Sequence, residues 1–122
     1  MHILVVEDDA TVRELIVSVL QREAHTVTEA TDGLQALAVL ANQRPDAIIL
    51  DINMPNMDGL TLLSRLKSDF PGEDFAVLML TAQSAPEDIK RAVQLGAKDY
   101  IGKPFEPRQL LRRLDRQARQ MH

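Results

Sequence analysis

The chain has 122 residues, about 45% of them hydrophobic and 26% charged, so it is long and apolar enough to fold as one domain with its own core. Its formal charge of -4 at pH 7, without a dense run of lysine and arginine, argues against direct binding of nucleic acid. It has no cysteine, which excludes disulfides and thiolate metal sites. It also has no signal-peptide pattern and no apolar stretch long enough to cross a membrane. We expect a single cytoplasmic domain over residues 1–122 that does not bind membranes.

Strand and helix patterns alternate along the chain. Short segments rich in β-branched residues or bounded by turn residues predict strands at Ile3–Val6, Thr26–Glu29, Ala47–Leu50, Phe75–Leu80 and, more weakly, Tyr100–Ile101. Apolar residues three and four positions apart predict helices with stripes over Val12–Leu20, Leu34–Ala41, Leu60–Leu66, Ile89–Val93 and Leu110–Met121. We expect each stripe to face a sheet. Such alternation with short connections calls for parallel strands and right-handed crossovers, so the predicted fold is a doubly wound α/β sandwich.

Polar residues stand where four of the five predicted strands end. In an open parallel sheet, ligands bind outside the carboxyl ends of the strands, so these side chains are expected to converge on one edge. In strand order they are Glu7, Asp8 and Asp9, then Asp51, then Thr81, then Lys103.

The acidic residues among them predict a metal site. Several carboxylates in one cleft repel each other, and a hard cation relieves that repulsion. Mg²⁺ is favoured, with Mn²⁺ as a possible substitute, because it prefers oxygen ligands and the chain has no cysteine. We expect the histidines, which lie at a terminus or in a predicted turn, to be solvated rather than metal ligands; they are His2, His25 and His122.

A carboxylate beside such a cation and a lysine is suited to phosphoryl transfer. Asp51 would attack phosphorus and become an acyl phosphate, Lys103 would neutralise phosphoryl oxygens, and Thr81 would donate a hydrogen bond. For any one of these residues alone, a helix cap or a polar strand end is the simpler interpretation. Their coincidence at four strand ends favours the site.

Four motifs carry these residues: Val5–Asp9, Ile49–Pro55 with Met57–Gly59, Leu80–Ala82, and Lys103–Phe105. Their order and spacing resemble the receiver domains of bacterial two-component response regulators, from His2 to about Arg119. The resemblance implies the fold of the chemotaxis regulators, a flavodoxin-like three-layer sandwich with a five-stranded parallel sheet in the order 2-1-3-4-5 and five helices. It also implies a phosphoprotein switch that catalyses only its own phosphorylation and dephosphorylation, rather than an enzyme.

The resemblance assigns the metal ligands and the phosphoacceptor. Asp51 would accept the phosphoryl group from a histidine kinase or a histidine phosphotransfer protein of a phosphorelay. Asp8, Asp51 and the backbone carbonyl of Asn53 would ligate Mg²⁺, while Glu7 would hold a metal-bound water. Many receivers have aspartate in place of Glu7, but glutamate is a familiar variant.

The resemblance also assigns the residues around the phosphoryl group. Thr81, Lys103 and the backbone N–H of Ala82 would contact its oxygens. The Lys103–Pro104 peptide bond is expected to be cis. Asn53 and Gln83 border the path of the attacking water, which implies an intermediate rate of self-dephosphorylation.

Signal output is expected at the surface of the fourth helix, fifth strand and fifth helix. There Thr81 and Tyr100 would act as the switch that changes affinity for an unknown output protein or domain. Asp99 and Arg113 could form one charged pair across a phosphorylation-dependent homodimer, although a monomer is equally compatible. The chain ends after the last helix, which slightly favours a stand-alone regulator over a domain of a longer protein.

The sequence leaves two other functions to consider. A haloacid-dehalogenase-type phosphatase also uses an aspartate nucleophile with Mg²⁺, but it needs a second aspartate where this chain has Asn53. A receiver-like interaction module that is never phosphorylated is the other alternative, and the complete set of acids, threonine and lysine argues against it.

Overall fold

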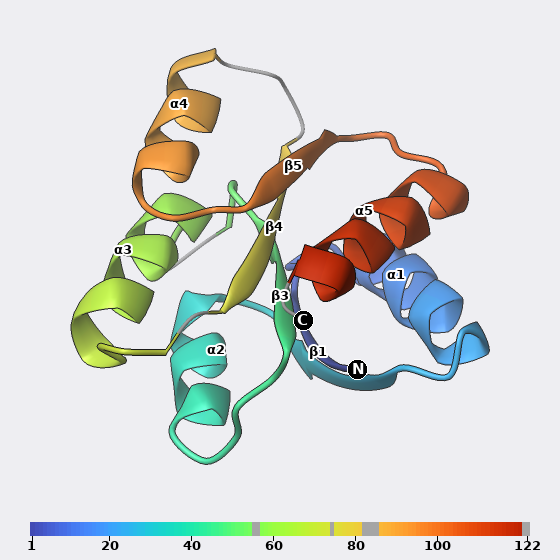
Figure 1. Cartoon of the computed structure of the whole chain (residues 1–122), viewed down its shortest axis with the longest axis horizontal. Helices are drawn as coiled ribbons and strands as arrows, with labels where there is room; N and C mark the ends of the chain where they lie inside the picture. Colours follow the sequence, from blue (N-terminus) through green and yellow to red (C-terminus); the bar gives the residue numbers. More distant parts are fainter. Residues whose placement is uncertain (55–56, 74, 82–85, 121–122) are drawn as a thin grey trace.

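The computed structural model describes residues 1–54, 57–73, 75–81 and 86–120. Strands and helices alternate along these residues (Figure 1). The strands are β1 (His2–Val6), β2 (Thr26–Ala30), β3 (Ala47–Asp51), β4 (Ala76–Thr81) and β5 (Asp99–Gly102). The helices are α1 (Ala10–Arg22), α2 (Gly33–Leu40), α3 (Gly59–Asp69), α4 (Pro86–Gln94) and α5 (Pro107–Gln120).

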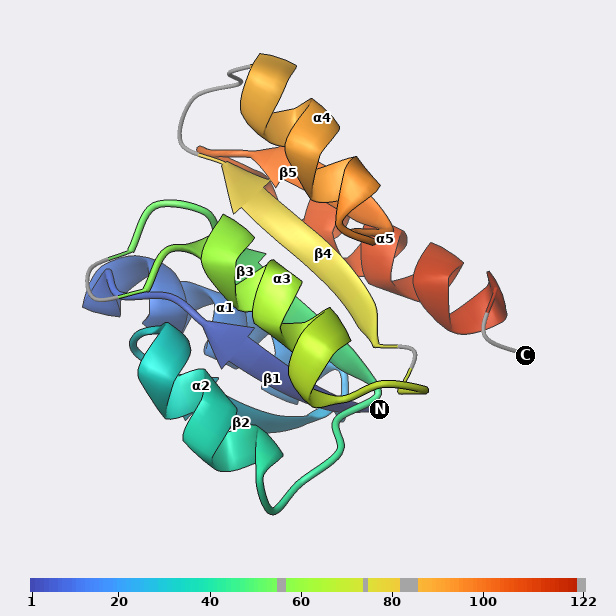
Figure 2. The same ribbon diagram turned by 90° about the vertical axis from the view of Figure 1, so that its left-hand side faces the viewer.

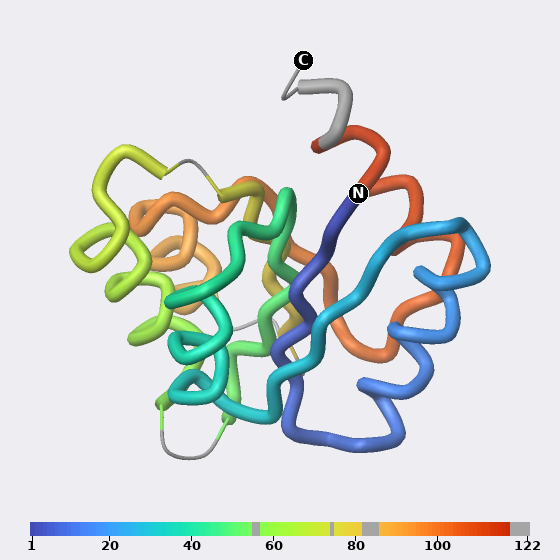
Figure 3. Tube along the Cα trace, turned by 90° about the horizontal axis from the view of Figure 1, so that it is seen from below, coloured from blue at the N-terminus to red at the C-terminus, as the bar shows by residue number. Residues whose placement is uncertain are grey.

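The strands form one parallel sheet in the order β2-β1-β3-β4-β5, which confirms the predicted fold. Figure 2 shows α2, α3 and α4 on one face of this sheet, and the tube in Figure 3 shows α1 and α5 together on the other. The order of the strands reverses between β1 and β3, so the crevice at which such sheets bind ligands lies at the carboxyl ends of these two strands.

Each face of the sheet has its own apolar core. Alternate residues of a strand point to opposite faces, so Leu4 and Val6 belong to the core under α2, α3 and α4, whereas Ile3 and Val5 belong to the core under α1 and α5. Because helices cover both faces of the sheet, β1 and β3 contain consecutive apolar residues instead of alternating apolar and polar ones.

The helix stripes are only partly buried, which corrects one prediction. Leu15, Leu34 and Val93 are 45%, 55% and 57% exposed, although each belongs to a stripe that was expected to face the sheet. The reason is geometric, because a helix on a sheet buries a narrower face than the full set of apolar positions covers.

The histidines also differ from expectation. His2 is part of β1 and half-buried, and its Nε2 lies 2.8 Å from Oγ1 of Thr28 on the adjacent β2. Half-buried His25 has Nδ1 3.1 Å from the terminal amine of Met1. These two histidines are therefore only partly solvated, because strand pairing holds the first residues of the chain against β2. His122 lies outside the described residues.

Aspartate side chains start three of the helices directly after the loops that follow the strands. Asp9, Asp32 and Asp58 accept hydrogen bonds from the backbone N–H of the third residue of α1, α2 and α3. The donor–acceptor distances are 3.1, 2.8 and 2.8 Å. These caps satisfy N–H groups that have no partner within the helix.

The start of α3 packs directly on the backbone that follows β3. The Gly59 N–H donates to the Ile52 carbonyl oxygen at 2.8 Å, and a Cβ atom at Gly59 would lie 2.3 Å from the carbonyl oxygen of Asp51. Any side chain there would push the helix away from the end of β3.

We predict that Gly59→Ala lowers the free energy of unfolding by about 1–3 kcal/mol, because the new methyl group overlaps backbone atoms that cannot move independently. Gly102→Ala is the control, since a Cβ atom there meets nothing within 4 Å. It should change stability by less than about 0.5 kcal/mol. Urea unfolding of both variants measures the difference, and equal losses would contradict the explanation.

Candidate functional site

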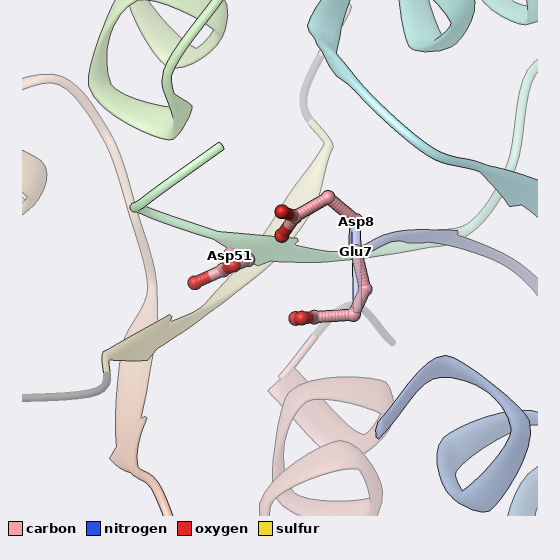
Figure 4. A group of neighbouring side chains, drawn as sticks. All are labelled: Glu7, Asp8 and Asp51. Carbon is pink, nitrogen blue, oxygen red and sulfur yellow. The ribbon is translucent and has the colours of Figure 1, made fainter. Parts of the chain in front are cut away.

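Three carboxylates from two neighbouring strands gather at one edge of the sheet. Val6 of β1 is in register with Leu50 of β3, so the residues that follow, Glu7 and Asp51, stand side by side. With Asp8 they place carboxylate oxygens within 4.8 Å of one another, and Figure 4 shows the three side chains together. The predicted convergence of these acids is therefore present.

Lys103 supplies the positive charge nearest to these acids. Its Nζ donates to both carboxylate oxygens of Glu7, at 3.0 and 2.9 Å, and lies 3.4 Å from Oδ2 of Asp51. Glu7 is completely buried and Asp51 is 2% exposed, whereas Asp8 is exposed. A buried carboxylate without a partner is costly, so the lysine offsets the burial of both acids.

The main chain around Lys103 holds it beside Thr81. Thr81, the last residue of β4, is in register with Gly102, and its carbonyl oxygen accepts a hydrogen bond from the Lys103 N–H at 2.6 Å. The Lys103–Pro104 peptide bond is cis, as expected.

The ionisable groups of the site shift each other's pKa. Burial raises the pKa of Glu7 and of Asp51. The charge of Asp51 raises the pKa of Glu7 further, and the charge of Asp8 does the same for Asp51. Lys103 lowers both pKa values but only partly offsets these effects. Burial lowers the pKa of Lys103, but its hydrogen bond to Glu7 and the charges of Asp51 and Glu7 outweigh burial, so the pKa rises overall. The lysine therefore stays charged while the two acids resist ionisation.

Thr81 carries a buried hydroxyl without a hydrogen-bond partner in the described part of the chain. An unsatisfied buried hydroxyl costs roughly 1–3 kcal/mol. Because Thr81 lies next to the lysine segment at the same sheet edge, a polar ligand at this edge is a suitable partner for its Oγ1. This is the chemistry expected of a group that binds an anionic oxygen.

Asp9 has another role in the structure than the predicted one, and Asn53 contacts Asp51 through its backbone. Asp9 is not part of the carboxylate cluster, because its side chain caps α1, while its N–H donates to Oε1 of Glu7 at 3.3 Å. Asn53 is exposed, and its N–H donates to Oδ1 of Asp51 at 3.3 Å. Ala82 and Gln83 lie outside the described residues.

The predicted output surface contains an ion pair within the chain. Arg113 of α5 donates through Nη1 to Oδ1 of Asp99 at 2.6 Å. The two residues pair within the chain because α5 runs back beside the strand that precedes it, and the possibility that they pair across a homodimer stays a prediction. Tyr100, the next residue of β5, is 43% exposed.

One residue close to the site was not predicted. Arg13, in the first turn of α1, donates through Nη1 to the Glu7 carbonyl oxygen at 2.8 Å and through Nε to Oε1 of Glu29 at 3.2 Å. A positive charge in the first turn opposes the helix dipole, which was the available signal that this arginine has a specific partner.

Comparison with known proteins identifies relatives along nearly the whole chain. A family model described as response regulator receiver domain matches residues 3–115. The response regulator MprA of Mycobacterium sp. strain KMS is 41% identical over 114 residues, which are 93% of this chain and 49% of the relative. The chain thus spans about half the length of such relatives.

Solved structures agree with the sequence matches. The chemotaxis protein CheY4 of Vibrio cholerae is 34% identical with a TM-score of 0.89, over 94% of this chain and 96% of that one. The receiver domain of a sensor histidine kinase from Pseudomonas aeruginosa is 33% identical with a TM-score of 0.85, over 94% of each chain, and it has a magnesium ion coordinated in its active site cleft. Among the helices described for our chain, none has the length and apolar content to span a membrane.

The raised pKa values of the buried acids predict a pH-dependent effect of Asp51→Asn. The folded chain holds protons on Glu7 and Asp51 more tightly than the unfolded chain does, because both pKa values are raised on folding. The stability that this difference contributes is fully present below the ordinary pKa values of 4.5 and 3.8, and it is lost as the pH rises through the raised pKa values. Replacing Asp51 by the neutral asparagine should therefore raise the melting temperature at neutral pH by roughly 4 °C, the shift that about 1 kcal/mol produces in a domain of this length.

Thermal melts in a chelator at about pH 7.5 and about pH 4 test this sign, since the gain should shrink at the lower pH. Glu14→Gln, at an exposed position of α1, is the control and should show no such trend. A gain from Asp51→Asn that is equally large at both pH values would show that ionisation is not its cause.

Proposed function

The chain belongs to the response regulator receiver domains of two-component systems, and on this basis we propose that it is a phosphorylation-dependent switch with Asp51 as phosphoacceptor. The observation that carries the proposal is the position of Asp51 at the end of β3, where it belongs to the acidic cluster and lies 3.4 Å from Nζ of Lys103. The phosphoryl donor would be a histidine kinase or a histidine phosphotransfer protein.

The proposed reaction transfers a phosphoryl group from a donor imidazole to Asp51. An Oδ atom of Asp51 forms a bond to phosphorus as the bond between phosphorus and the donor nitrogen breaks. Lys103 supports the step in two ways, because its charge favours the ionised nucleophile and can then neutralise phosphoryl oxygens. The Thr81 hydroxyl, which has no other partner among the described residues, would donate a hydrogen bond to one of them.

The donor set at this edge fits a hard divalent cation. Three carboxylates lie within 4.8 Å, and hard oxygen ligands are those that Mg²⁺ prefers. We propose that Asp8, Asp51 and the backbone carbonyl of Asn53 hold Mg²⁺, or Mn²⁺ in its place, with Glu7 contributing through water. Bound there, the cation would supply positive charge against the phosphoryl oxygens. Asp8 is the exposed member, whereas both oxygens of Glu7 already accept hydrogen bonds from Lys103.

The proposed output follows from the neighbours of Thr81. A phosphoryl group that engages the Thr81 hydroxyl would pull the end of β4, and the exposed ring of Tyr100 on the adjacent β5 would then change its position on the surface of α4, β5 and α5. The partner would be an output protein or an output domain, and the active form a monomer or a homodimer. The rate of dephosphorylation is proposed to depend on Asn53 and Gln83.

Incubation with acetyl phosphate and Mg²⁺ should add the mass of one phosphoryl group to the intact chain, and the adduct should be labile to base. Asp51→Asn should abolish the adduct, because the amide oxygen is a poor nucleophile. Asp58→Asn is the matched control, since asparagine can still cap α3.

Intact-mass spectrometry measures the three proteins in parallel. A wild-type chain that acquires no adduct would overturn the proposal. Sustained hydrolysis of a phosphate ester, without a stable adduct, would instead favour a phosphatase of the haloacid-dehalogenase type.

The neighbouring acids Asp8 and Asp9 should differ in their effect on Mg²⁺ binding. Asp8→Asn should weaken binding at least about tenfold, because it removes one of the few charged ligands of the proposed site. Asp9→Asn should leave affinity within about twofold, because Asp9 caps α1 and asparagine caps equally well. Isothermal titration with MgCl₂ compares them, and equal losses would place both acids, not Asp8 alone, in the metal site.

A further inference from the structure

The peptide groups that carry the acids Glu7 and Asp8 are held by a side chain outside the cluster. The Arg13 guanidinium donates to the Glu7 carbonyl oxygen at 2.8 Å, and its Nη1 lies 3.5 Å from the carbonyl oxygen of Asp8. Its Nε donates to Glu29 near the end of β2. Arg13 thus connects the first turn of α1, the loop after β1 and the neighbouring strand.

The contact of Arg13 with the loop carbonyls helps to fix the orientation of the Glu7 and Asp8 carboxylates. The Glu7 N–H donates to the Ala30 carbonyl oxygen at 3.1 Å, so the segment after β1 is fixed to β2 on its N–H side. The Arg13 guanidinium fixes the opposite, carbonyl side. With both sides held, the peptide planes cannot rotate freely, and the Cα–Cβ bonds of Glu7 and Asp8 keep the directions that bring their carboxylates to Asp51.

The ion pair with Glu29 alone does not explain the arrangement. Glu29 is 50% exposed, and exposed ion pairs contribute little to stability. The Arg13 side chain is only 17% exposed, and a positive charge in the first turn of α1 opposes the helix dipole. Its hydrogen bonds to the loop carbonyls, made by a planar group with several fixed donors, are what distinguish this position from an ordinary helix surface.

We propose that Arg13 is a positioning residue for the acidic cluster: by clamping the carbonyl oxygens of the loop after β1, it sets the affinity of the site for a divalent cation. The inference rests on the proposed function, because it assumes that Glu7, Asp8 and Asp51 bind Mg²⁺. Arg13 does not itself touch the cation. It acts through the orientation of Asp8 and Glu7, as residues that support metal ligands do in other proteins.

The test compares Mg²⁺ affinity with stability in the absence of metal. Arg13→Met keeps an apolar stem and removes every donor, so it should weaken Mg²⁺ binding by about tenfold, as loss of a ligand-supporting residue does. Arg13→Lys keeps the charge but not the planar fork, so it should weaken binding by about threefold or more. Glu29→Gln removes the ion pair and leaves the carbonyl contacts, so affinity should stay within about twofold.

Isothermal titration with MgCl₂ gives the affinity, and thermal melts in EDTA give the stability of the metal-free chain. A purely structural role would lower the melting temperature and leave the affinity unchanged, and this result would overturn the inference. Full affinity in Arg13→Lys would show that charge, not positioning, matters, and it would also overturn it. If Arg13→Met does not fold, the lysine variant decides alone. Failure of the wild-type chain to bind Mg²⁺ would instead overturn the proposed function.

Discussion

Two carboxyl groups buried side by side at the ends of β1 and β3 are the constraint on which the rest of this structure depends. Glu7 and Asp51 are nearly inaccessible to water, burial raises the pKa of both, and the charge of Asp51 raises the pKa of Glu7 further. Such a pair is tolerated only with a nearby positive charge, and Lys103 provides it from the far end of the chain. The order of the strands, the segment after β5 and the end of β4 together bring that lysine to the site.

The surroundings of the acids are correspondingly rigid. Gly59 lets α3 pack against the backbone that follows Asp51, and Asp58 caps that helix. On the other side, Asp9 caps α1 while Arg13 holds the carbonyl oxygens of the preceding loop. The strand ends are therefore fixed from both layers of helices. A cluster of charges with fixed positions is suited to the proposed cation and phosphoryl group, because preorganised charges need not rearrange when a ligand binds.

The same arrangement carries an energetic cost. Buried acids with raised pKa values and the unsatisfied Thr81 hydroxyl do not stabilise the fold. Two separate apolar cores, one on each face of the sheet, offset that cost. Because these groups destabilise the unphosphorylated chain, an added negative charge at the site can shift its conformational equilibrium, as a switch requires.

The sequence by itself determined the class of fold and indicated that Glu7, Asp8, Asp51, Thr81 and Lys103 meet at one edge of the sheet. Short apolar runs bounded by turn residues and apolar stripes of period 3.6 are local properties, so the strands, the helices and the polar residues at the strand ends could be predicted from them. The spacing of the motifs around Asp51, Thr81 and Lys103 was specific enough to indicate the family and, through it, the strand order.

Only the tertiary structure decided which partner each charged group has. Lys103 donates to Glu7, 96 positions away in the chain, and approaches Asp51 less closely. Arg13 binds loop carbonyls, Asp9 caps a helix, and Asp99 pairs with Arg113 within the chain. The same holds for the exposure of apolar helix residues such as Leu34. These outcomes depend on how helices pack on the sheet and on the reach of side chains across it, which periodicity does not encode.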